Sequence, residues 1–161
     1  MILLPHIITG AVIGAKTQNF GLIIILGFLI HFIMDRIPHW DYSIKGVQDF
    51  RKTRNFKKLI ITLIKIGIDG LIGLLIVFLT LWQKEQLNFN YLLFVLFGIF
   101  VSVLPDIIFA FFILFMPTHL LKNYLDFHYK YLHLKKEGGI TFLGLSAQIA
   151  VIIFVLVVFF L

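Results

Sequence analysis

The sequence predicts an all-α protein: a polytopic membrane helix bundle with about four full transmembrane helices, a short N-terminal helix and a cytoplasmic amphipathic helix. Of its 161 residues, 60% are hydrophobic and only 14% are charged, whereas soluble domains carry about 25% charged residues. The mean hydropathy is +1.02, and several apolar runs reach the roughly 20 residues that a helix needs to cross a bilayer. The length suits a single domain, residues 1–161.

The first helix is expected over residues 2–15, which are too few to cross a hydrocarbon core of ~30 Å. We expect a half-spanning, re-entrant or tilted helix that packs against the others. His6, Gly10 and Gly14 recur every four residues and therefore share one face. The spacing of the two glycines lets a neighbouring backbone approach closely. The segment has no basic n-region, so we do not expect a cleavable signal peptide.

A first full-length span is predicted over residues 20–37. It carries His31 and Asp35 one helical turn apart, on one face. Pro38 ends the helix because its ring clashes with the preceding turn and it has no N–H. His39 follows in the exit turn, where it either ligates a metal or is simply hydrated.

Three further spans are predicted in the rest of the chain, over residues 57–82, 90–116 and 140–161. An interfacial amphipathic helix is predicted over residues 119–137. The span over 57–82 is interrupted by Lys65 and Asp69, and the span over 90–116 holds Asp106 directly after Pro105. Ionisable groups within membrane spans are costly, and they mark functional sites by default.

The positive charge of the chain, +6 in total, is concentrated in residues 36–58 and 119–137. This pattern is typical of cytoplasmic loops, so we expect an integral membrane protein with both segments in the cytoplasm. Membrane lipids are the expected partners, because the basic loop either marks topology alone or also touches anionic headgroups. No nucleic-acid partner is expected. The absence of cysteine excludes disulfides, thiolate metal sites and cysteine nucleophiles.

Three segments repeat one pattern, in which small residues and an ionisable group share a helix face: His6-Gly10-Gly14, Gly27-His31-Asp35 and Gly98-Ser102-Asp106. Helices pack in lipid along small-residue faces, so each ionisable group is expected to face the bundle. Histidine and carboxylate ligands suit zinc or manganese, which activates water at an open position. Counted from the basic helix ends, Asp69 and Asp106 fall at similar depths, and His31 lies one to two turns nearer the cytoplasmic surface.

A purely structural interpretation competes with this one. His31 and Asp35 would form a self-contained hydrogen bond, and Lys65 and Asp69 an ion pair. Asp106 would bond Ser102 or a carbonyl that Pro105 releases. A shared mononuclear site requires Asp106 and His31 to lie within ~8 Å of each other, because metal–ligand bonds are about 2 Å long.

Three stretches of the chain carry a family resemblance: PHIITGAVIGA at 5–15, HFIMDRIPHWDY at 31–42 and LPDI at 104–107. They resemble small prokaryotic membrane-bound proteins of the inner-membrane-associated hydrolase type, assigned as metal-dependent hydrolases. A more distant similarity is to zinc-dependent phospholipase C, whose ligand helix carries His-x3-Asp. The resemblance implies metal ligands at His6, His31, Asp35 and Asp106. The chain departs from the hydrolase pattern at Ile108, where the family has a second acid, and it lacks the motif His-Arg-Gly-x-Thr-His-Ser.

Together these observations predict a membrane-embedded, metal-dependent hydrolase of a prokaryotic cell membrane. Its substrate is expected to be a phosphoester of a lipid or lipid-linked compound near the cytoplasmic leaflet. The expected cofactor is zinc, with manganese as the alternative, and the predicted site residues are the ligands His6, His31, Asp35, Asp106 and His39, with Asp69 as a ligand or general base. Two other classes remain open: a small ion- or proton-coupled transporter that uses intramembrane acids, and a non-catalytic structural membrane protein.

Overall fold

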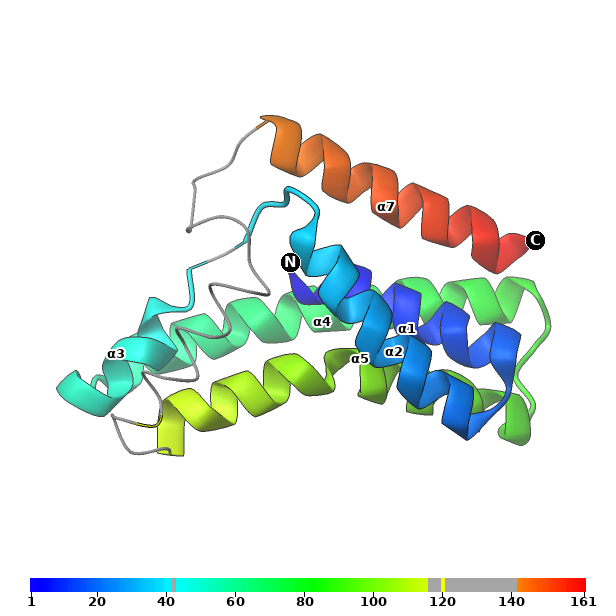
Figure 1. The fold of residues 1–161 in the computed structure, drawn as a ribbon. Helices are drawn as coiled ribbons and strands as arrows, with labels where there is room; N and C mark the ends of the chain where they lie inside the picture. The colour runs from blue at the N-terminus through cyan, green and yellow to red at the C-terminus, as the bar shows by residue number, and fades with distance from the viewer. Residues whose placement is uncertain (42, 116–119, 121–141) are drawn as a thin grey trace.

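The computed structural model describes residues 1–41, 43–115, 120 and 142–161. These residues contain helices and no strand (Figure 1), which confirms the all-α prediction. The helices are α1 (Leu3–Thr17), α2 (Phe20–Arg36), α3 (Lys45–Thr53), α4 (Phe56–Gln83), α5 (Phe89–Phe115) and α7 (Phe142–Phe160). The amphipathic helix predicted over 119–137 lies outside the described residues.

Three helices are long and apolar enough to cross a membrane: α4 with 28 residues, α5 with 27 and α7 with 19. Only 22–28% of their apolar windows is buried inside the protein, and large side chains such as Leu71 and Phe111 are exposed. An apolar exterior of this kind is typical of helices that face lipid. The structure is therefore consistent with a helical membrane protein, and α2, with 17 residues, is shorter than these three.

Helix α1 forms the centre of the bundle. Every residue from Pro5 to Ala15 is buried, and the helix packs against α2, α4, α5 and α7. Ile8 and Ala11 of α1 meet Val77 of α4, Val95 of α5 and Phe159 of α7 in one apolar cluster. The prediction that the short N-terminal helix packs against the others is confirmed, and its place is the interior of the bundle.

Glycines bring α1 and α5 into backbone contact. A Cβ on Gly98 would overlap the carbonyl of Gly10, and a Cβ on Gly14 would overlap the carbonyl of Phe94. The close approach predicted from the Gly10–Gly14 spacing is therefore present. Gly10 meets Gly98 and Gly14 meets Phe94, so the sequence numbers run in opposite directions and the two helices are antiparallel.

Helices α1 and α2 form a hairpin and end about halfway along α4 and α5. The nine steps from Asp106 to Phe115 rise about 14 Å, and the thirteen steps from Phe56 to Asp69 rise about 20 Å. Helix α3 packs against the parts of α4 and α5 that extend beyond the hairpin (Figure 1). The N-terminal end of α1 and the C-terminal end of α2 consequently lie near the middle of the two long helices.

Candidate metal centre

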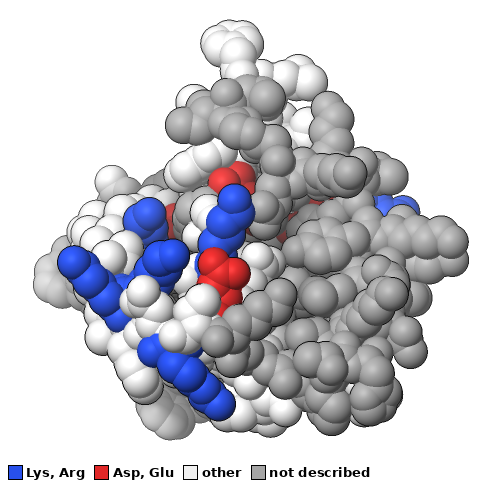
Figure 2. Space-filling model, turned by 90° about the vertical axis from the view of Figure 1, so that its left-hand side faces the viewer, with Lys and Arg blue, Asp and Glu red and all other residues white. Residues whose placement is uncertain are grey.

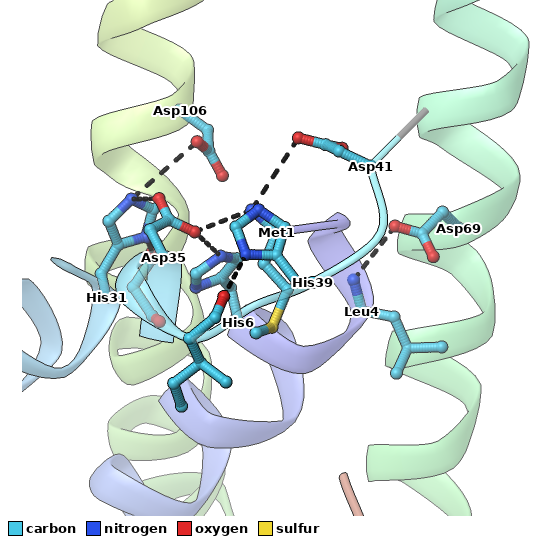
Figure 3. Close-up of polar contacts among 11 residues, drawn as sticks. Met1, Leu4, His6, His31, Asp35, His39, Asp41, Asp69 and Asp106 are labelled. Carbon is cyan, nitrogen blue, oxygen red and sulfur yellow. Dashed lines mark hydrogen bonds and ion pairs between the residues drawn. The ribbon is translucent and has the colours of Figure 1, made fainter. Parts of the chain in front are cut away.

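The three small-residue stripes meet at one place in the bundle (Figure 3). His6 of α1, His31 of α2 and Asp106 of α5 each offer a ligand atom, and these atoms lie within 4.8 Å of one another. His31 Nε2 is 3.9 Å from Asp106 Oδ1, well inside the ~8 Å that a shared mononuclear site allows. The two residues lie at the same level of the bundle, so the expected offset of one to two turns between them is wrong. The offset was counted from helix ends, and α2 ends halfway along α5.

His31 is held by its Nδ1 atom, which lies 2.8 Å from the carbonyl oxygen of Ser102. A carbonyl only accepts, so Nδ1–H is the donor and Nε2 of the neutral ring carries the lone pair. Nε2 is buried, makes no hydrogen bond within the described part of the chain, and lies 3.3 Å from Asp35 Oδ2. A lone pair that faces the oxygens of Asp35 and Asp106 is repelled, unless a proton or a metal cation lies between them.

His6 is arranged in the complementary way. Its Nε2 lies 3.1 Å from Asp35 Oδ1 and donates to that oxygen when the carboxyl is ionised. Its Nδ1 is buried and has no hydrogen-bond partner among the described residues. The ring lies against that of His31, with centroids 4.3 Å apart. Each histidine thus bonds a protein acceptor through one ring nitrogen and leaves the other ring nitrogen available to a ligand. Histidine ligands of metals are commonly oriented by such a hydrogen bond from the nitrogen that does not bind the metal.

Asp35 of α2 joins the two helices of the hairpin through contacts with Met1 and with His6 of α1. It is buried, and its Oδ1 accepts from the amino nitrogen of Met1 at 2.7 Å as well as from His6. It contacts both histidines but does not belong to the three-residue group whose ligand atoms lie within 4.8 Å of one another. In this geometry Asp35 orients the rings, and its role as a direct ligand stays a prediction.

Asp69 lies on the other side of the N-terminal end of α1. Its Oδ2 accepts the backbone N–H of Leu4 at 3.1 Å, in the first turn of the helix. The N-cap residue, Ile2, provides no side-chain cap. Asp69 therefore caps α1 from α4, and a carboxylate is favourable at the positive end of a helix dipole. The structure places Asp69 outside the group of His6, His31 and Asp106, and its predicted role as ligand or general base stays untested.

The exit turn after α2 returns past the site (Figure 3). His39 Nδ1 lies 2.7 Å from the carbonyl of Ile37, and Asp41 Oδ2 lies 3.9 Å from the Met1 nitrogen. Burial lowers the pKa of His39, because it penalises the charged imidazolium. His39 is not a member of the three-residue group, so its role as a ligand also stays a prediction.

The three grouped side chains suit a divalent metal. Tetrahedral zinc bonds of about 2.0–2.2 Å place ligand atoms ~3.4 Å apart, so the group needs to contract by roughly 1 Å. Two histidines and one carboxylate are a common catalytic zinc set that leaves one position open. The two histidine side chains are fully buried, whereas that of Asp106 is 37% exposed. Asp106 is therefore on the accessible side of the site.

Two features of the site have no signature in the sequence. Ser102 belongs to a predicted stripe, yet it acts through its backbone carbonyl, which every residue has. One partner of Asp69 is likewise a backbone N–H, that of Leu4. The ion pair between Lys65 and Asp69 stays a prediction, beside the hydrogen bond of 3.1 Å that joins Asp69 to the main chain of α1.

Comparison with known proteins finds no matching family model, no matching curated protein and no matching solved structure. The fold and the site together define a class: a helical protein of membrane type with a buried histidine–carboxylate cluster at the centre of its bundle.

Proposed function

We propose that the chain binds one divalent metal ion between His6, His31 and Asp106, with Asp35 orienting the two rings. Zinc is the preferred ion and manganese the alternative. The observation that carries the proposal is the pair of buried ring nitrogens, one on each histidine, that lack a hydrogen bond within the described residues. Buried polar atoms are otherwise almost always paired, and each of these belongs to a ring whose other nitrogen is held.

The activity that this site supports best is metal-dependent hydrolysis of a phosphoester in a lipid or lipid-linked compound. A bound zinc ion supplies positive charge that lowers the pKa of coordinated water to about 7. The chain itself orients both histidines, through Asp35 and the carbonyl of Ser102. Asp106 completes the set from the accessible side. The apolar exterior of α4, α5 and α7 supports a substrate that reaches the site from the bilayer.

The first test is metal content. Protein purified in mild detergent from medium supplied with zinc and manganese is analysed by elemental mass spectrometry. We expect about one equivalent in the wild type and in the control Asp49→Asn, which changes an acid on α3. We expect loss of the metal in the double variant His31→Ala, Asp106→Ala. Less than a tenth of an equivalent in the wild type would overturn the proposal.

Hydrolysis is tested separately, on phospholipid and chromogenic phosphodiester substrates, with the metal-loaded protein. Activity is expected to disappear with a chelator and to return when zinc or manganese is restored. If the protein binds one equivalent of metal but hydrolyses none of these substrates, the proposed metal site stands and the proposed hydrolase activity is refuted.

A proton- or ion-coupled transporter is the second candidate. It is favoured by the position of the cluster near the middle of α4 and α5, because transporter sites lie near the bilayer midplane. The contacts from His31 through Asp35 to His6 also form a chain along which a proton can pass. In liposomes, a transporter would move protons or metal ions at a rate that falls in Asp106→Asn. A hydrolase would leave the vesicles impermeable.

A further inference from the structure

A separate surface lies where α3 covers the ends of α4 and α5, away from the group of His6, His31 and Asp106. Gly46 of α3 packs directly on α4, since a Cβ there would overlap the Lys58 carbonyl and the Thr62 hydroxyl. Val47 beside it is 4% exposed. Helix α3 is therefore held across the ends of two helices that are long enough to cross a membrane. The ends of such helices reach the headgroup region of a bilayer.

The exposed side of this region is basic. Helix α3, the residue that caps it and the start of α4 expose four cations among the described residues: Lys45, Arg54, Lys57 and Lys58. Figure 2 shows Lys and Arg side chains gathered on this face of the molecule. The opposite end of the bundle has Lys16, Lys84 and Glu85, and Lys84 is engaged there by the carbonyl of Phe159. Among the residues that the structure describes, the positive charge is thus concentrated at one end.

Aromatic rings lie directly beside the cations. The guanidinium of Arg54 is 5.6 Å from the centroid of the Phe50 ring, and Phe50 meets Phe56 edge-on at 5.0 Å. Phe56 is 64% exposed. Exposed aromatic and basic side chains at the end of a span form the pattern of an interfacial anchor, with the ring in the acyl boundary and the cation at phosphate level.

We propose that this surface, formed by Lys45, Arg54, Lys57 and Lys58 around Phe50 and Phe56, binds the phosphate headgroups of anionic phospholipids. The charge is complementary, and the position at the end of α4 and α5 brings the cations to the headgroup layer. Each cation near an anionic membrane surface contributes about 1 kcal/mol, which is roughly fivefold in affinity. The proposal does not depend on the metal site.

The test is native mass spectrometry of the full chain in detergent with equal amounts of phosphatidylglycerol and phosphatidylcholine. We expect preferential binding of phosphatidylglycerol, reduced about fivefold in Lys57→Gln and further in Lys57→Gln with Lys58→Gln. The matched control is Lys16→Gln, an exposed lysine at the opposite end, and it is expected to keep the preference. The substitutions are at exposed positions, and elution volume checks that each variant is folded.

Three results would overturn the proposal. Equal binding of the two lipids would remove the selectivity for anionic headgroups. An equal loss in Lys16→Gln and Lys57→Gln would show that net charge, and not this surface, attracts the lipid. Complete displacement by inorganic phosphate at the same concentration would reassign the surface to free phosphate.

Discussion

The contact between α1 and α5 is tested most directly by Gly98→Ala. A Cβ at this position would overlap the Gly10 carbonyl and lie 3.0 Å from the Gly14 nitrogen. Alanine gains about 1 kcal/mol over glycine in a helix, whereas overpacking costs about 1–3 kcal/mol. The neighbouring atoms are backbone and cannot rotate away, so the cost falls at the upper end. The net destabilisation is about 2 kcal/mol.

The matched control is Gly67→Ala on α4, where a Cβ meets nothing within 4 Å. This variant receives the gain in helix propensity without the overlap, so it is expected to be up to about 1 kcal/mol more stable than the wild type. Both free energies of unfolding are measured by titrating SDS against a mild detergent and following the helical signal. Equal stability of the two variants would refute the close approach of α1 and α5.

Three further predictions follow from single contacts. Asp69→Ala removes the cap on Leu4 and is expected to lower the free energy of unfolding by about 1 kcal/mol, whereas Asp69→Asn is expected to keep most of this stability. If the asparagine variant keeps its stability but loses hydrolysis, Asp69 acts as a general base instead. Lys84→Met removes the donor to the carbonyl of Phe159 and is expected to weaken the end of α7 by about 1 kcal/mol, measured as faster amide exchange there. Zinc at 100 times its Kd is expected to stabilise the wild type by about 2.7 kcal/mol in thermal unfolding, and His6→Ala is expected to abolish that gain; an equal gain in the variant would contradict the assignment of His6.

The site could be predicted in part because helical periodicity determines which residues share a face. The four-residue spacing of His31 and Asp35, and of Gly10 and Gly14, gives the inner side of each helix without reference to its neighbours. Periodicity within one helix contains no information about the vertical offset between helices. Asp106 and His31 therefore meet at a level that the helix ends did not indicate.

The fold was predictable to a similar extent. Apolar runs of more than 20 residues identify α4 and α5 directly, and the shortness of residues 2–15 shows that they need the other helices around them. The central position of α1 depends on contacts with helices much later in the chain, such as that of Gly10 with Gly98. Such pairings are decided by the fit of whole surfaces, and one sequence does not show them.

The central position of α1 has a consequence for the order of assembly. The helix precedes its partners in the chain, and its glycine face fits α5, whose contact residues are made more than eighty positions later. Transmembrane helices are generally inserted first and associate afterwards. Helix α1 is too short to insert stably alone. It therefore reaches its final position, as part of the hairpin with α2, only after α4 and α5 have been synthesised. The cluster of His6, His31 and Asp106 therefore cannot form until α5, which supplies Asp106, has joined the hairpin.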